Sequence, residues 1–135
     1  ATTGATAFDG GVLEVSSPNI NGGSWAEFSF PAVGGSFVTG GYNKTISLSF
    51  GNPLANRPCW SGNSVGYVTT TVNLGSTVIG QTIQIRFRMG TDNQAVSGGG
   101  WRIDTITSTS RSCVDGLAPT VTAPGAGTVT QTLCQ

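Results

Sequence analysis

Hydrophobic and polar residues alternate with a period of two along much of the chain. The clearest alternation covers residues 83–89, and the pattern recurs over 68–74 and 45–50. Shorter apolar stretches at 11–16, 25–30, 36–39 and 101–107, with weaker ones near Thr120 and Val129, have similar compositions. A period of two is typical of half-buried β-strands, and no segment has the uninterrupted composition that a helix needs. The pattern therefore predicts an all-β protein.

Glycine-rich turn sequences separate the predicted strands. They include Asn21-Gly22-Gly23, Gly34-Gly35, Gly40-Gly41 and Gly98-Gly99-Gly100, all built from residues that tolerate positive φ. The first of these lies between residues 12–15 and Trp25 and predicts the clearest hairpin. About eight short strands, with a turn every 8–12 residues or so, indicate an antiparallel β-sandwich.

The chain length and the distribution of prolines suggest one main domain. A chain of 135 residues is long enough to bury a substantial core. Residues 1–107 are expected to form the sandwich. Residues 108–135 are a Pro/Thr/Gly-rich C-terminal segment, interpreted as a linker or an added edge strand.

The charge of the chain narrows the functions that it can have. Only 9% of the residues are charged, the net charge is zero, and there is no histidine. A neutral chain has no basic surface for nucleic acid or for anionic membranes. Without histidine it cannot build a Ser-His-Asp site or a His-ligated zinc site by itself. No apolar run is long enough to cross a membrane, and we predict a protein that is not an enzyme.

The three cysteines point to an oxidising environment. A disulfide between Cys113 and Cys134 would fasten the C-terminal segment to the domain. Cys59 is then left over and is interpreted as a small buried hydrophobic residue, with pairing to one of the other two as the alternative. The low charge and the candidate disulfide favour a secreted protein, extracellular or on the cell surface. The chain begins at Ala1 with no leader, so we expect a mature product or an excised domain.

Several motifs in order along residues 8–107 resemble one family of domains. They are residues 9–16 (DGGVLEVS), Trp25, residues 40–43 (GGYN), residues 60–70 (WSGNSVGYVTT) and residues 100–106 (GWRIDTI). Together they are similar to bacterial secreted jelly-roll modules, akin to MAM domains and carbohydrate-binding modules, found in extracellular peptidases and surface proteins. The resemblance implies a jelly-roll sandwich without catalytic residues.

The resemblance also implies that a strand is missing. Family members have one or more strands before the Asp-Gly-Gly segment, whereas only eight residues precede Asp9 here. A missing strand would leave an open sheet edge. We therefore expect either a fragment or a strand supplied by another chain through β-augmentation, with the C-terminal segment as a candidate replacement.

A structural calcium ion is one candidate cofactor. In similar modules an aspartate on the last strand often contributes to such a site, and Asp104 matches by position. Asp9 lies in a glycine-rich turn with exposed carbonyls and is the expected companion. The alternative is a surface ion pair of Asp104 with Arg102, Arg86 or Arg88, or a turn role.

Aromatic residues are the other candidate binding groups. Trp60, Tyr67 and Tyr42 lie in or beside glycine-rich loops, and sugar rings can pack their apolar faces on such side chains. Trp25 and Trp101 alternate like strand residues and are expected in the core. For Trp60, the alternative to ligand binding is a role in the core or in anchoring its loop. The sequence thus predicts a non-catalytic module for adhesion or for recognition of glycan or extracellular protein. The alternative is a structural subunit of an extracellular filament or surface assembly, in which further copies add strands to one another.

Overall fold

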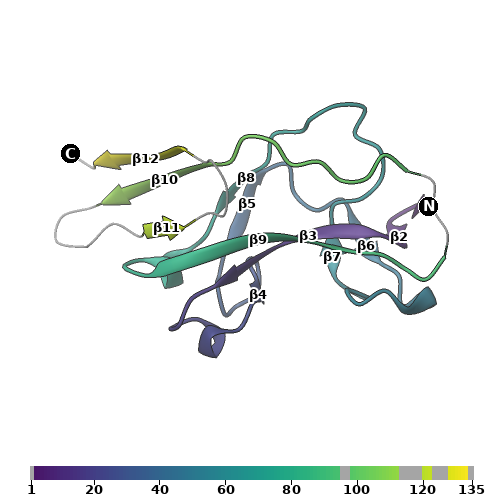
Figure 1. Cartoon of the computed structure of the whole chain (residues 1–135), viewed down its shortest axis with the longest axis horizontal. Helices are drawn as coiled ribbons and strands as arrows, with labels where there is room; N and C mark the ends of the chain where they lie inside the picture. The colour runs from purple at the N-terminus through teal and green to yellow at the C-terminus, as the bar shows by residue number, and fades with distance from the viewer. Residues whose placement is uncertain (1, 95–97, 113–119, 123–127, 134–135) are drawn as a thin grey trace. The chain divides into compact units, whose positions relative to one another are not determined.

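The computed structural model describes residues 2–94, 98–112, 120–122 and 128–133. These residues form short strands and the short 3-10 helices η1 (Asn21–Gly23), η2 (Ser49–Gly51) and η3 (Ser76–Val78), so the protein is all-β as predicted (Figure 1). No helix in these ranges has the length and hydrophobicity to cross a membrane.

One four-stranded sheet is built around two long neighbouring strands. Its order is β11 (Thr120–Thr122), β9 (Thr82–Gly90), β3 (Gly10–Ser16) and β4 (Ala26–Glu27), and Figure 1 shows β9 and β3 side by side. Strands β3 and β4 are antiparallel, with Glu14 opposite Glu27. The predicted hairpin around Asn21-Gly22-Gly23 is therefore confirmed, with η1 in its connection.

The other strands form one four-stranded sheet and two pairs. The second sheet has the order β1 (Thr2–Thr3), β2 (Thr6–Ala7), β6 (Lys44–Ile46) and β7 (Pro58–Cys59). Strand β5 (Ser36–Thr39) pairs with β8 (Thr71–Asn73), and β10 (Thr107–Ser112) pairs with β12 (Thr128–Leu133). The pairs β2–β6, β9–β11 and β10–β12 are parallel, which the sequence pattern did not predict. They join strands far apart in the chain, where no tight hairpin imposes antiparallel pairing.

Several predicted strands are shorter than the alternation suggested. The strand predicted over 45–50 ends at Ile46, because Leu48 adopts a helical conformation and Phe50 has a φ of +65°. The strand predicted over 68–74 is reduced to Thr71–Asn73. Residues 101–106 form no strand, and β10 begins at Thr107.

The chain divides into two compact units, each with its own buried residues. Unit 1 comprises Ala1–Leu13, Phe37–Val72 and Phe87–Arg102, and unit 2 comprises Glu14–Ser36, Asn73–Arg86 and Ile103–Gln135. The core of unit 1 contains Ala7, Val12, Ile46, Leu54 and Cys59, with Tyr42 packed against it. In unit 2 the buried apolar residues include Val15, Ile20, Phe28, Val33, Val78 and Ile83.

Strand β3 is buried along its whole length, on both faces. Two glycines allow this in unit 1. A Cβ on Gly10 would lie 2.5 Å from Cys59 Sγ, and one on Gly11 would lie 2.5 Å from the Trp101 ring. Only glycine permits so close an approach of side chains to the backbone.

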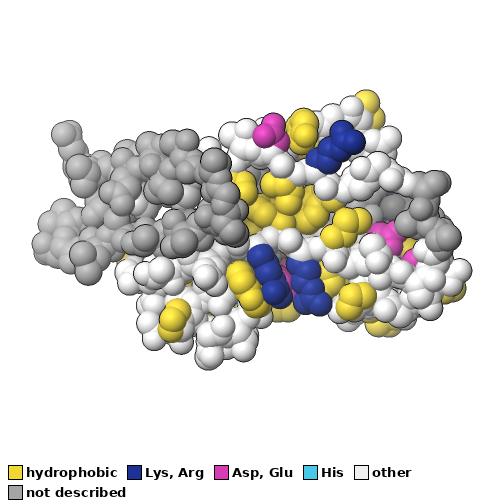
Figure 2. Space-filling model, in the orientation of Figure 1, with side chains coloured by type: hydrophobic (Ala, Val, Ile, Leu, Met, Phe, Trp, Pro, Cys, Tyr) yellow, Lys and Arg dark blue, Asp and Glu magenta, His cyan; other side chains and the backbone are white. Residues whose placement is uncertain are grey.

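Charged side chains are sparse on the surface, as the face in Figure 2 illustrates.

Candidate recognition site

Five aromatic rings gather in unit 1. Tyr42 and Trp60 have ring centroids 4.6 Å apart, and Phe37 contacts both at 4.8 and 5.6 Å. Trp101 lies 5.9 Å from Trp60 and 5.8 Å from Phe87. All five side chains are half-buried. Edge-to-face and tilted pairs at these distances are favourable for aromatic rings, so the cluster is a stable base for the segments that leave it.

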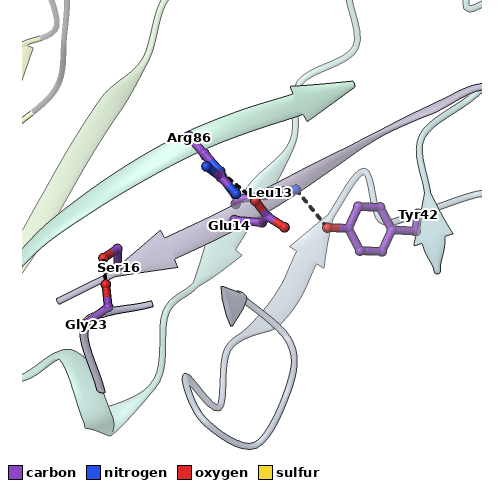
Figure 3. Close-up of polar contacts among 6 residues, drawn as sticks. All are labelled: Leu13, Glu14, Ser16, Gly23, Tyr42 and Arg86. Atoms are coloured by element: carbon purple, nitrogen blue, oxygen red, sulfur yellow. Dashed lines mark hydrogen bonds and ion pairs between the residues drawn. The ribbon is translucent and has the colours of Figure 1, made fainter. Parts of the chain in front are cut away.

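The polar groups of Trp60 and Tyr42 are satisfied within the protein. Trp60 Nε1 donates to the Gly40 carbonyl at 2.8 Å, and the Trp60 backbone exchanges two hydrogen bonds of 2.9 Å with Gly11. The Tyr42 hydroxyl accepts from Leu13 N at 2.9 Å (Figure 3). These two aromatic residues therefore anchor the fold, which was the alternative interpretation for Trp60 in the sequence.

The loop of residues 61–70, hereafter the 61–70 loop, leaves this cluster directly after Trp60. Its first residue is held firmly, because Ser61 Oγ donates to the Asp9 carbonyl at 2.6 Å and Ser61 exchanges two hydrogen bonds with the Asn43 side chain. Its last residue is held by Thr70 Oγ1, which donates to the Gly40 carbonyl at 3.0 Å. Both ends of the loop are thus fixed to the aromatic base.

The middle of the 61–70 loop exposes apolar side chains. Val65 is 95% exposed, Tyr67 71% and Val68 63%. Val65 has a φ of +64°, a conformation that is strained for a β-branched residue. Asn63 Oδ1 accepts from Val65 N at 2.9 Å, and Ser64 Oγ donates to the Gly66 carbonyl at 2.6 Å. The loop's own polar side chains therefore stabilise a backbone that presents apolar groups to solvent.

The predicted binding residues occupy two different settings. Trp60 and Tyr42 are brought together in the aromatic cluster, whereas Tyr67 lies in the exposed loop and contacts no other aromatic ring among the described residues. The exposed neighbours Val65 and Val68 were not singled out from the sequence. Their signal was the glycine on either side of residues 63–65, which indicated a turn, together with the absence of any charge over residues 60–85.

Each of the two predicted calcium ligands accepts a hydrogen bond from a backbone N–H group. Asp9 Oδ1 accepts from Asp92 N at 3.0 Å in unit 1, and Asp104 Oδ1 accepts from Thr105 N at 2.9 Å in unit 2. Within the part of the chain that the structure describes, no group of three or more Cys, Asp and Glu side chains is placed to hold a metal ion. The calcium ion stays a prediction. Cys113 and Cys134, the predicted disulfide, lie outside the described residues.

Buried charge occurs in unit 2, at a place that the sequence did not indicate. Glu14 is 3% exposed, and its Oε2 accepts from Arg86 Nε at 2.6 Å (Figure 3). The guanidinium carbon of Arg86 lies 4.3 Å from the centre of the Trp25 ring, a cation–π distance. Glu27, also 3% exposed, lies opposite Glu14 on β4. The alternation suggested that Arg86 was a surface residue and a candidate partner for Asp104, but its partner is Glu14.

Cys59 is a fully buried free thiol, as its interpretation as a small hydrophobic residue predicted. Burial raises the pKa of the thiol from 9.0 to about 11, and the Lys44 charge opposes this rise only in part. The unfolded chain then releases this proton first as the pH rises, so the unfolded state binds fewer protons between these two pKa values.

Alkaline conditions should therefore destabilise the protein through Cys59. The stability that the neutral thiol contributes is fully present below pH 9 and is lost as the pH rises toward 11. At about 1.4 kcal/mol per pKa unit, the free energy of unfolding falls by about 2–3 kcal/mol over this range. Denaturant unfolding of the wild type and of Cys59→Ala at pH 8 and pH 10.5 (roughly the ends of that window) measures the difference. Equal pH dependence in the two chains would contradict the prediction.

Comparison of the chain with protein-family models, curated proteins and solved structures found no match.

Proposed function

We propose that the chain is a non-catalytic, extracellular β-sandwich module of jelly-roll type that recognises glycan or protein through the 61–70 loop. The observation that carries the proposal is the exposure of Val65, Tyr67 and Val68 on a loop fixed at both ends. Binding groups are often found on loops that a rigid scaffold positions. A strained backbone that surrounding contacts maintain is also found more often at functional sites than elsewhere.

The chemistry of the loop favours neutral contacts. Residues 60–85 contain no charged side chain, so an ionic ligand would find no counter-charge within this stretch. Tyr67 offers an aromatic face together with a hydroxyl group, which suits a sugar ring or an apolar protein surface. Because the loop is held by its own hydrogen bonds, little conformational entropy is lost when a ligand binds.

A second candidate is a structural subunit of an extracellular filament or surface assembly, held by strand addition between copies. The observation that favours it is an uncharged, exposed segment next to β8, residues 67–70. An unprotected strand edge of this kind is a ready partner for another strand. Negative-stain microscopy of native material separates the two functions, because long fibres support the assembly and discrete particles oppose it.

Removing the Tyr67 ring should weaken recognition. A glycan array and a panel of immobilised extracellular matrix proteins are probed with the wild type and with Tyr67→Ala. We expect the wild type to bind a subset of the panel and Tyr67→Ala to lose at least about tenfold in affinity, the effect typical of an aromatic contact residue. Ile79→Ala is the control, since Ile79 is also exposed (65%) but lies outside the loop. Binding by no member of either panel would defeat the proposal.

A further inference from the structure

One segment of the chain has the composition of a longer strand than it forms. Residues 67–74 (YVTTTVNL) contain no glycine, proline or charged residue and are rich in Val, Thr and Tyr, which favour strands. Only Thr71–Asn73 become strand β8, paired with β5. Sites where the local preference of the sequence disagrees with the structure are often functional or strained.

The unformed part of this strand is open to solvent. Tyr67 and Val68 are 71% and 63% exposed, and residues 69–71 are exposed as well. Beyond the β5–β8 pairing, residues 67–73 make no backbone hydrogen bond to any other described residue. A charged residue or a proline usually protects a free edge, and the sequence of this segment contains neither.

The order of residues in the segment is a palindrome. Residues 68–72 read Val-Thr-Thr-Thr-Val, centred on Thr70. If two copies pair antiparallel about a twofold axis through Thr70, then Val68 lies opposite Val72 of the other copy and Thr69 opposite its Thr71. Valine pairs and threonine pairs are both favourable when they lie directly opposite across two strands. The same pairing in any other register loses this match.

The charge of the chain also favours a second copy as the partner. The net charge is zero, so two copies approach without the repulsion that keeps strongly charged proteins apart. An isologous pair about a twofold axis is the commonest arrangement in protein oligomers.

We propose that two copies of this chain associate by antiparallel pairing of residues 67–73 about Thr70, which joins their β5–β8 pairs into one sheet. The inference rests on strand addition between copies, the second candidate function, and not on ligand recognition by the loop. A twofold pair is closed, so a filament needs a second interface elsewhere in the chain.

Cysteine cross-linking tests the register of the pair. Directly opposite Cα atoms are about 4.5–5.5 Å apart, within the range of a disulfide, whereas equivalent Cα atoms at position 69 would be roughly 8 Å apart and beyond it. Under mild oxidation the full chain carrying Thr70→Cys should form a covalent dimer. Thr69→Cys and Thr71→Cys should each stay monomeric alone and form a dimer when mixed. The wild type, with its native cysteines, gives the background.

The result that overturns the proposal is equally specific. If Thr70→Cys stays monomeric, or if Thr69→Cys alone forms dimers as readily as Thr70→Cys, the register is wrong. Fibres that persist under these outcomes would place strand addition at another edge and leave the second candidate function standing.

A lysine substitution tests the same interface without a cross-link. Val68→Lys places a charge inside the pair, whereas Ile79→Lys places it on an exposed position outside both the paired residues and the 61–70 loop. In sedimentation experiments over about 5–500 µM chain, a range that covers weak association, we expect Val68→Lys to lower the association constant at least tenfold and Ile79→Lys to leave it unchanged. Equal dimerisation by both variants overturns the proposal. Circular dichroism verifies that both variants fold.

Discussion

Replacing Arg86 with methionine is expected to lower the free energy of unfolding by about 2–3 kcal/mol. Methionine keeps much of the apolar length of the side chain but removes the guanidinium, leaving the Glu14 carboxylate, only 3% exposed, without its 2.6 Å partner. We expect a smaller loss of unfolding free energy than for a fully buried ion pair, because the Arg86 side chain is itself 36% exposed. Urea denaturation of the wild type and Arg86→Met measures it.

A double-mutant cycle separates the ion pair from other effects of the substitution. Glu14→Gln in the Arg86→Met background should cost less than Glu14→Gln in the wild type, because the Arg86–Glu14 ion pair that it would break is already absent. Arg102→Met is the control, since Arg102 is exposed and should change stability by less than about 0.5 kcal/mol. Additive effects of the two substitutions would contradict the pairing.

Gly11→Ala is also expected to lower the free energy of unfolding, by about 2–3 kcal/mol. The new Cβ would lie 2.5–2.7 Å from three atoms of the Trp101 ring. That ring is held between Trp60 and Phe87, so it can retreat only by disturbing the aromatic cluster. We expect both a lower unfolding free energy and a change in the near-ultraviolet circular dichroism of the folded protein.

Gly99→Ala provides the matched control for this effect. Gly99 is exposed, and a Cβ there would meet nothing within 4 Å, so both signals should be close to those of the wild type. If Gly11→Ala is as stable as Gly99→Ala, the ring of Trp101 does not pack against the backbone of β3.

The strands that the sequence predicted best are those whose alternation continues through the whole element. Residues 83–89 fall within β9, and residues 36–39 coincide with β5. Prediction failed where a backbone turn interrupts the alternation. Phe50 at positive φ ends the pattern of 45–50, and nothing in a bulky apolar residue signals that conformation. The parallel pairings also escaped prediction, because they depend on long-range contacts rather than on local turns.

The candidate site was predictable in part for a similar reason. Glycine-rich flanks indicated that Tyr67 lies in a loop, whereas the inward anchoring of Trp60 and Tyr42 depends on Gly40 and Leu13, distant in the chain. The burial of Glu14 was hidden because alternation assigns one face of a strand to solvent, and β3 is covered on both faces. Its partner, Arg86, lies on a strand far along the sequence.

Equilibrium binding by loop variants tests the recognition function most directly. The ligand from the glycan and protein panels that binds best is titrated against the wild type, Val65→Ser/Tyr67→Ala and the control Ile79→Ser, in low and high salt. We expect the Kd to rise at least about tenfold in the loop variant and to stay unchanged in the control. The Kd should be nearly independent of salt, because the loop is uncharged. Equal affinity of the loop variant and the wild type, with the fold intact, would contradict recognition by this loop.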